Sequence, residues 1–217
     1  GGQIAFGPRE AVPHVPPAPA VRDERRPHIL LGFRGFQVGG AEIFPVHLAN
    51  ALVAQGLTVS MLPTNPQDTT DVLRHRLDPR VAVYEPIHLT ERGIASFCAD
   101  AGIDLVHSHC STVETLFFGD AQGPPAVPYI VSLHGHYDLD QPVVPDATML
   151  RMLRSISHWV YTAPKNLRFL DGLPIDKDVF SHIPNGMQVE AEPFPSTREG
   201  LGIAVDDIVF ALVARPV

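Results

Sequence analysis

Cysteine is scarce in this chain of 217 residues, which contains two, Cys98 and Cys110. Small secreted domains rely on several disulfides because their cores are small, and two cysteines cannot supply such a framework. The sequence therefore favours a protein of the reducing cytoplasm. Long apolar runs are scarce as well, since the longest ones have the length of a strand. We therefore expect no transmembrane segment.

Positive charge is also in short supply. The chain has 16 lysines and arginines against 24 acids, which gives a net charge of −8, and charged residues make up 18% of it. The densest basic group, residues 22–26, has two acids inside it. Non-specific nucleic-acid binding needs clustered Lys and Arg, so we expect no nucleic-acid partner. Hydrophobic residues make up 45%, which is enough to bury a core in about one to one and a half domains.

Proline is unevenly distributed along the chain. Six of the 22 prolines fall within the first 27 residues. Proline lacks a backbone N–H and fixes φ, so a segment this rich in it favours an extended chain over a helix or a sheet. We therefore expect residues 1–27 to form an arm without regular structure.

Beyond the arm, short apolar runs alternate with amphipathic segments. Continuous apolar runs are typical of strands buried on both faces of a sheet, and apolar residues at helical spacing indicate helices. This alternation predicts an α/β fold over residues 28–190, a Rossmann-like parallel sheet with helices on both faces. The expected strands are 28–33, 58–62, 81–84, 105–107, 129–133, 158–161 and 180–183, and the expected helices are 41–55, 91–101, 111–118 and 146–155.

Several residues predict where individual helices begin and end. Gly56 is placed to stop the first helix, and Pro45 is tolerable in it only if the helix begins late. Residues 111–114, Ser-Thr-Val-Glu, predict a capping box at the start of a helix. Thr162 is expected to cap a short helix that has Pro164 in its first turn.

The end of the chain predicts a second domain. Residues 191–200 include two prolines and read as an interdomain linker, and residues 197–202 could form a short helix. Residues 207–214 are apolar enough for a buried strand, with nothing after them to pair with. We interpret residues 201–217 as the truncated start of this C-terminal domain.

The loop that follows the first strand is a candidate ligand site. In open α/β sheets, ligands bind beyond the carboxyl ends of the strands, near the change in strand order. Gly39 and Gly40 precede a helix there, so the backbone can approach a ligand closely and its N–H groups attract anions. A tight strand-to-helix turn explains the same two glycines. The loop is not the G-x-G-x-x-G dinucleotide fingerprint.

Two His-x-His pairs leave the ends of two other predicted strands. They are His107 with His109, and His134 with His136. An imidazole at such a position can bind a hydroxyl, a phosphate or a developing charge. Metal binding is one alternative, and local hydrogen bonding by ordinary loop residues is another. We expect His134 to be the residue that acts.

Five motifs occur in an order and spacing that resembles retaining GT-B glycosyltransferases of the glycosyltransferase group 1 family. Together they span about residues 29–215, although each is loose by itself. Pro45 is a departure from the family's pattern in the first helix. The motifs are Gly39-Gly40-Ala41-Glu42 with the helix after it, Ile103–His109, Pro128–Gly135, Ile183–Met187 and Arg198–Arg215.

The resemblance implies the N-terminal, acceptor-side half of a GT-B fold, and it implies roles for particular residues. The loop at Gly39 and Gly40 would lie against the donor diphosphate and the acceptor, His134 would face the transferred sugar, and Arg215 would reach the diphosphate from the donor-binding second domain. The remaining candidates for donor or acceptor binding are Glu42, His109, His136 and Asn185. No metal or other cofactor is expected, because helix N-termini and basic side chains can neutralise the phosphates.

The implied activity is transfer of a sugar, of the hexosyltransferase type, from a nucleotide-sugar donor to an acceptor hydroxyl, with retention. The chain alone would be inactive, because most of the donor pocket would lie in a C-terminal domain that is missing from it. Two alternatives stay open: a standalone Rossmann-like binding or regulatory module, and a nucleotide-sugar epimerase of the same two-domain shape. The unpaired segment 207–214 disfavours the module, and the Gly39–Glu42 loop favours the transferase.

Overall fold

A computed structural model describes residues 26–65, 71–119, 126–135, 146–170, 177–186 and 197–210. The predicted arm at residues 1–27 lies almost entirely outside these ranges. Among the helices within them, none has both the length and the apolar character needed to cross a membrane.

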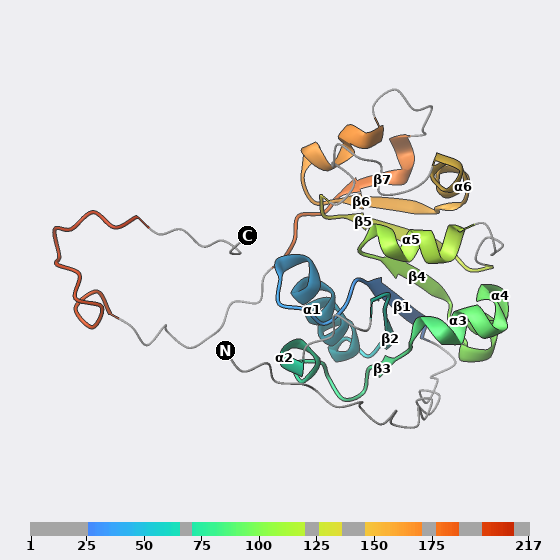
Figure 1. Cartoon of the computed structure of the whole chain (residues 1–217), viewed down its shortest axis with the longest axis horizontal. Coiled ribbons are helices and arrows are strands. Elements are labelled where there is room, and N and C mark those ends of the chain that lie inside the picture. The colour runs from blue at the N-terminus through green and yellow to red at the C-terminus, as the bar shows by residue number, and fades with distance from the viewer. Residues whose placement is uncertain are drawn as a thin grey trace, which may run out of the picture.

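Seven parallel strands form one sheet, in the order β3-β2-β1-β4-β5-β6-β7 (Figure 1). The predicted Rossmann-like α/β fold is confirmed, because every pairing is parallel and a helix follows most strands. The strands are β1 His28–Phe33, β2 Thr58–Pro63, β3 Ala82–Val83, β4 Leu105–Ser108, β5 Tyr129–Leu133, β6 His158–Tyr161 and β7 Phe180–His182.

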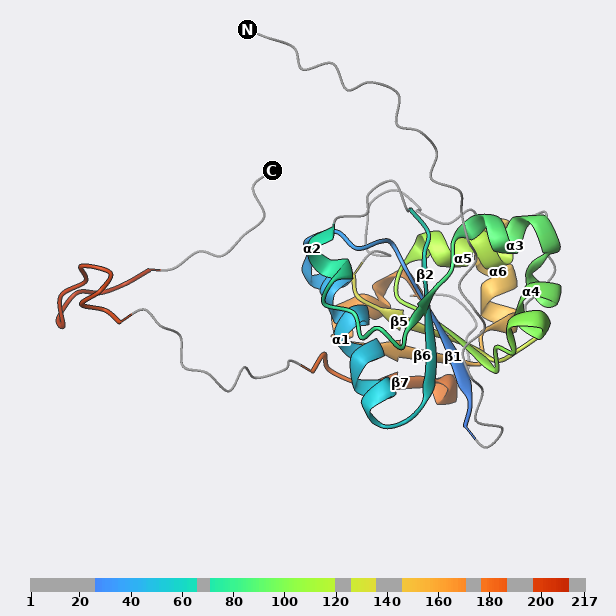
Figure 2. The same cartoon turned by 90° about the horizontal axis from the view of Figure 1, so that it is seen from below.

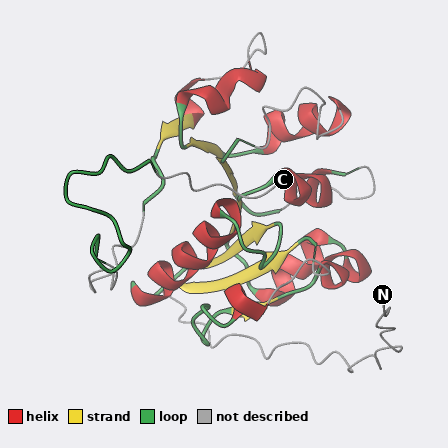
Figure 3. Ribbon diagram, turned by 60° about the vertical axis from the view of Figure 1, so that its left-hand side comes forward, coloured by secondary structure: helices red, strands yellow, loops and turns green. Residues whose placement is uncertain are grey.

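Helices cover both faces of the sheet. Figure 2 shows α1 and α2 on one side and α3 to α6 on the other, and Figure 3 shows the strands enclosed between helices. The helices are α1 Gly40–Ala54, α2 Asp71–Arg74, α3 Pro86–Arg92, α4 Ile94–Ala101, α5 Ser111–Phe118 and α6 Asp146–Ser155, with the 3₁₀ helices η2 Pro164–Leu170 and η3 Lys177–Val179.

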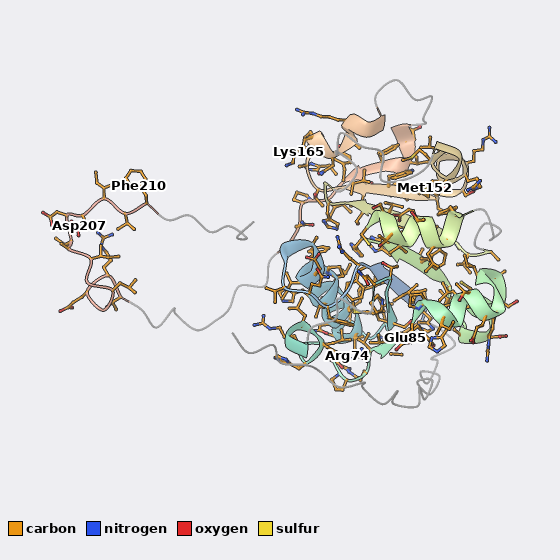
Figure 4. The ribbon with its side chains drawn as sticks, viewed as in Figure 1. Arg74, Glu85, Met152, Lys165, Asp207 and Phe210 are labelled. Atoms are coloured by element: carbon orange, nitrogen blue, oxygen red, sulfur yellow. The ribbon has the colours of Figure 1, made fainter. Side chains whose placement is uncertain are left out.

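Alternate residues of β1 pack into two separate core layers. Leu30 points into the layer under α4, α5 and α6, which includes Phe117 and Met152, whereas Leu31 points into the layer under α1, which includes Val46 (Figure 4 labels Met152). All six residues of β1 are buried. This is why the sequence of the strand is a continuous apolar run rather than an alternating one.

The strand order reverses between β1 and β4, which are neighbours in the sheet. α1 follows β1 onto one face, and α5 follows β4 onto the other. The connections from β1 to α1 and from β4 to α5 therefore diverge at the carboxyl ends of these strands. Doubly wound sheets bind their ligands at such a place. The backbone N–H of His109 donates to the Gly32 carbonyl at 2.9 Å, which ties the end of β4 to β1.

The helix predicted at residues 91–101 is two helices instead. Gly93 has a φ of 76°, which breaks the helical path between α3 and α4. α3 begins at Pro86, earlier than predicted, and Glu85 and His88 form a reciprocal capping box at its start. The prediction missed this start because the box uses His where Glu or Gln is the usual partner.

The capping box predicted at residues 111–114 is not formed. Cys110 is the residue that precedes α5, and no side chain caps the helix there. Glu114 is fully buried instead, and its Oε1 accepts a hydrogen bond from the Tyr129 hydroxyl at 3.2 Å. The Glu114 carboxylate therefore bonds Tyr129 of β5, whereas the local pattern predicted that it would bond the backbone at the helix start.

The predicted cap at Thr162 is also different in the structure. The Thr162 hydroxyl donates to the Leu133 carbonyl at 3.1 Å, rather than accepting from the helix. Asn166 supplies the cap, because its Oδ1 accepts from the Ala163 N–H at 2.8 Å. The helix that follows, from Pro164, is of the 3₁₀ type.

Pro45 lies inside α1, which begins at Gly40, so the expectation of a late start is wrong. Proline cannot donate the helical hydrogen bond to the carbonyl of Ala41. Its ring is buried, as are Val46 and Ala49 of the same helix. Burial of this apolar ring offsets part of the lost bond.

The described segment 197–210 forms turns. Leu201 N–H donates to the Thr197 carbonyl at 3.0 Å, but no helix is formed at residues 197–202. The Arg198 guanidinium donates to two backbone carbonyls further along. Residues 207–210 are exposed and form no strand, contrary to the prediction for 207–214, whose remaining residues lie outside the described ranges (Figure 4 labels Asp207 and Phe210).

Candidate functional site

Three of the predicted site residues meet at the carboxyl edge of the sheet. His109 follows β4, His134 follows β5 and Asn185 comes shortly after β7. The Nδ1 of His109 lies 3.1 Å from the Nε2 of His134, and the Nδ1 of His134 lies 3.4 Å from the Nδ2 of Asn185. Two other predicted residues, His136 and Arg215, lie outside the described ranges.

The start of α1 borders this cluster. Phe44, in α1, has its ring centroid 5.2 Å from that of His134 and 5.8 Å from that of His109. The sequence did not single out Phe44, because its place one helical turn after Gly40 has the pattern of an ordinary core position. Only the tertiary structure shows that it packs against both imidazoles.

The glycine loop leaves open space at the start of α1. Gly39 is extended and precedes the helix, and its carbonyl accepts from the N–H groups of Glu42 and Ile43 at 3.3 and 2.9 Å. A Cβ added at Gly40 would meet nothing within 4 Å. The helix N-terminus therefore offers an accessible, electropositive surface to an anion.

Glu42 is turned into the protein. Its exposed fraction is 7%, and it lies in the first turn of α1, where a carboxylate is favoured by the helix dipole. The structure thus places the Glu42 carboxylate where it can stabilise the helix start, and its predicted contact with a ligand stays a prediction.

His109 is neutral at neutral pH. It is 2% exposed, and burial, followed by the neighbouring His107 and His134, holds its pKa well below the usual value of 6.5. A neutral imidazole has one N–H donor and one acceptor nitrogen. Its Nδ1 faces His134, and its Nε2 is buried with no hydrogen-bond partner among the described residues.

His134 is half-buried and is held in a fixed position. The next residue, Gly135, has a φ of 103°, a conformation that favours glycine. His109, Phe44 and Asn185 surround the His134 ring. The residue lies at the carboxyl edge of the sheet, one strand from the β1–β4 pair where the strand order reverses. This is a suitable place to contact a ligand bound beyond the sheet.

His107 supports the cluster from within the sheet. Its Nε2 lies 2.8 Å from the Ser132 Oγ on the neighbouring strand, and its ring centroid is 4.3 Å from that of His109. Burial, and secondly His134, lower the pKa of His107 to about 4. The residue is therefore a neutral, half-buried histidine whose ring contacts a serine on the neighbouring strand.

Cys110 is unsuited to nucleophilic attack. Its Sγ lies 3.1 Å from the Thr112 hydroxyl, which in turn lies 2.5 Å from the Thr64 hydroxyl at the end of β2. Burial, with a smaller effect of the Glu114 carboxylate, raises the pKa of the thiol to about 11. A thiol of this kind stays protonated at neutral pH.

Within the described ranges, no group of three or more His, Cys, Asp or Glu side chains could hold a metal ion. The two nitrogens that face each other, on His109 and His134, are within hydrogen-bond distance, so each occupies the direction that the other would use for a metal.

The sequence matches a known protein family, described as Glycosyltransferase Family 4, over residues 38–191. No curated protein matches it. Among solved structures, HepE (Alr3699) of Anabaena, in complex with UDP and glucose, is 14% identical with a TM-score of 0.50, and the match covers 75% of this chain and 45% of HepE. The chain therefore spans less than half the length of HepE.

Two further structures have lower TM-scores. MurG of Acinetobacter baumannii is 15% identical, with a TM-score of 0.45, over 76% of this chain and 47% of MurG. A sucrose-phosphate synthase structure from Thermosynechococcus elongatus is 19% identical, with a TM-score of 0.45, over 73% of this chain and 89% of that one. The HepE likeness is a likeness of fold, that of the Rossmann-like half of a GT-B protein.

Proposed function

The chain belongs to the family Glycosyltransferase Family 4, and on this premise we propose that it is the acceptor-side domain of an enzyme that transfers a sugar from a nucleotide-sugar donor to an acceptor hydroxyl. We extend the proposal to transfer of a hexose with retention of the anomeric configuration. The family match over residues 38–191 is the observation that carries the reaction class. The geometry at the carboxyl edge supports the roles of individual residues.

His134 is the residue that we assign to the transferred sugar. It is half-buried at the end of β5, with Phe44 of α1 packed against its ring. The start of α1 therefore lies beside it, and the helix N-terminus at Gly39 and Gly40 attracts the donor phosphates. A sugar joined to those phosphates would reach the imidazole.

The proposed reaction needs no protein nucleophile. The acceptor hydroxyl oxygen forms a bond to the anomeric carbon while the bond from that carbon to the donor phosphate oxygen breaks. The leaving phosphate oxygen takes the proton of the acceptor hydroxyl. The protein supplies positioning and charge stabilisation, and the proposal includes no metal or organic cofactor.

We propose that a second domain completes the donor pocket. HepE, which is about twice as long as the matched part of this chain, was solved with UDP and glucose, and this supports a nucleotide sugar as the donor class here. In the proposal, residues 201–217 belong to that second domain, and Arg215 reaches the donor diphosphate. The chain by itself would then lack turnover.

A turnover assay on the protein that carries both domains tests this function. A panel of UDP- and GDP-sugars is screened for release of nucleoside diphosphate in the presence of candidate acceptors. His134→Ala is expected to lower kcat on the order of 100-fold, since it removes a contact to the reacting sugar. The far-UV spectrum and thermal midpoint should stay close to those of the unmodified protein.

His158→Gln provides the matched control. His158 begins β6 at the opposite edge of the sheet, where its Nε2 lies 2.9 Å from the Ser181 hydroxyl, and glutamine can keep that bond. This variant should retain full turnover. Unchanged turnover in His134→Ala would reject the role of His134, and a protein that consumes no nucleotide sugar at all would reject the function.

A further inference from the structure

The side chain of His109 has one polar contact among the described residues, and that contact is with His134. Its other nitrogen, Nε2, is buried without a partner in the same part of the chain. A histidine that only filled the core would be a poor choice for such a place, because an apolar side chain of similar size would leave no polar atom unsatisfied. The contact with His134 is therefore what distinguishes His109 from an apolar residue.

The contacts with Asn185 and His109 favour one tautomer of His134. The Asn185 Nδ2 is a donor, so the Nδ1 of His134 accepts from it. The proton of a neutral His134 is then on Nε2, which donates to the Nδ1 of His109. A proton on the Nδ1 of His134 would instead place two donors against each other at Asn185.

We propose that His109 is a positioning residue, which orients the His134 ring and holds it in the tautomer that carries its proton on Nε2, so that its Nδ1 faces the open edge of the sheet as a hydrogen-bond acceptor. Asn185 occupies that acceptor in the structure, but it is exposed and its contact is long, at 3.4 Å. A ligand hydroxyl can therefore replace Asn185 as the donor.

This arrangement favours one class of ligand group at His134. An acceptor nitrogen binds a hydroxyl, whereas it repels the oxygens of a phosphate, which are acceptors themselves. Resting on the proposed function, the inference assigns the Nδ1 of His134 to a hydroxyl of the sugar. The phosphates would lie at the helix N-terminus of α1 instead.

The surroundings of His109 keep its ring in place. The His107 ring lies against it at 4.3 Å between centroids, and the Phe44 ring lies at 5.8 Å on the side of α1. The low pKa of His109, caused by burial and by its two histidine neighbours, keeps the ring neutral, so that one of its two nitrogens is an acceptor at neutral pH. A ring that is packed in place and stays neutral can act as a fixed hydrogen-bond partner for His134.

Nuclear magnetic resonance of ¹⁵N-histidine-labelled chain tests the inference without a ligand. Long-range proton–nitrogen correlation near neutral pH reports which ring nitrogen carries the proton. In the unmodified chain, we expect the His134 signal of a single tautomer, protonated on Nε2. A His134 protonated mainly on Nδ1, or an even mixture of the two forms, would overturn the inference.

Three variants separate positioning from packing. His109→Phe keeps a ring but removes the acceptor, so the His134 tautomers should become mixed. His109→Asn presents a side-chain oxygen near the former Nδ1 and should restore the Nε2 form. His158→Gln, away from this cluster, can keep its contact with Ser181 and should leave the His134 signal unchanged. If His109→Phe leaves the His134 tautomer intact, His109 does not position it.

Turnover in the protein with both domains gives a second readout. His109→Phe should lower kcat roughly tenfold to a hundredfold with little change in the KM for the donor, and His109→Asn should recover part of the loss. Failure of the proposed function would show as no turnover in any variant, while the tautomer result would still stand. Failure of this inference would show as unaltered tautomers in an active enzyme.

Discussion

At the scale of single residues, three histidines of the same cluster have different chemistry because their surroundings differ. The His107 ring contacts a serine on the neighbouring strand. His109 is buried, with one polar contact in the part of the chain that the structure describes, and His134 is half-buried at the open edge. Burial lowers the pKa of the first two and so excludes them as acids or bases near neutral pH. His134 is the candidate for contact with a ligand because it is half-buried at the open edge, and not because it is a histidine.

Gly135 fixes the direction in which His134 leaves β5. We predict that Gly135→Ala lowers the free energy of unfolding by about 1–2 kcal/mol, because a φ of 103° strains a residue with a Cβ. Space is not the cause, since the added Cβ would lie at an ordinary 3.5 Å from the Asn166 Nδ2. Urea unfolding of the two proteins measures the difference.

Gly40→Ala is the control for this effect. A Cβ at Gly40 would meet nothing within 4 Å, and its φ is not in the left-handed region. Alanine is also the better helix former, so stability should be unchanged or up to about 1 kcal/mol higher. Equal losses in the two glycine variants would contradict a backbone origin for the Gly135 effect.

At the scale of elements, α5 lies unusually close to β1. A Cβ added at Gly32 would be 2.5 Å from the Val113 Cγ1 and 3.0 Å from its Cγ2. The missing side chain of Gly32 therefore lets the start of α5 approach the strand at the point where the strand order reverses. This close packing places Cys110 and His109 next to the end of β1.

We predict that Gly32→Ala destabilises the protein by about 1–3 kcal/mol through overpacking. Val113→Ala removes both methyl groups that the new Cβ would meet, so the double variant should lose less than the sum of the single variants. The coupling free energy should be at least about 1 kcal/mol in a double-mutant cycle measured by urea unfolding.

A second cycle controls for general core effects. Val46 is buried in the layer on the other face of the sheet, and a Cβ at Gly32 would have no contact with it within 4 Å among its nearest atoms. Gly32→Ala and Val46→Ala should therefore be additive. Coupling of similar size in both cycles would show that the clash with Val113 is not the cause.

At the scale of the whole molecule, histidines with lowered pKa values link stability to pH. The unfolded chain protonates these histidines below about pH 6.5, whereas folded His107 stays neutral down to about pH 4 and folded His109 also resists protonation. The unfolded state thus binds more protons in this range. Their stabilising contribution is complete above pH 6.5 and is lost as the pH falls toward 4.

We predict that the free energy of unfolding falls between about pH 6.5 and pH 4 by up to about 1.4 kcal/mol per pH unit for each of the two histidines. Urea unfolding across this range gives the slope. His107→Gln should make the slope shallower, because glutamine does not titrate. A slope that is identical in the variant and the unmodified protein would contradict the assignment.

A binding experiment belongs to the same scale. If a second domain supplies most of the donor pocket, this chain should bind UDP- and GDP-sugars weakly at best in isothermal calorimetry. Nucleotide-sugar affinity in the micromolar range would mean that the chain carries the donor pocket itself, and the proposed division of the site would be wrong.

The sequence by itself determined the fold class. Continuous apolar runs such as residues 28–33 and 129–133 satisfy both faces of a buried strand, and the amphipathic segments between them satisfy one face of a helix. Their alternation leaves a parallel sheet with helices on both sides as the solution. The strand ends also predicted that His109 and His134 lie at one edge of the sheet, where the structure places them side by side, and their role in binding stays a prediction.

Only the tertiary structure decided what the individual side chains do. Glu114 has the spacing of a helix cap, but a buried hydroxyl on β5 takes its carboxylate. Phe44 has the spacing of a core residue, but it packs against two imidazoles. The reason is physical: local patterns set backbone conformation through neighbours in the chain, whereas hydrogen-bond partners and pKa values depend on segments that are distant in sequence.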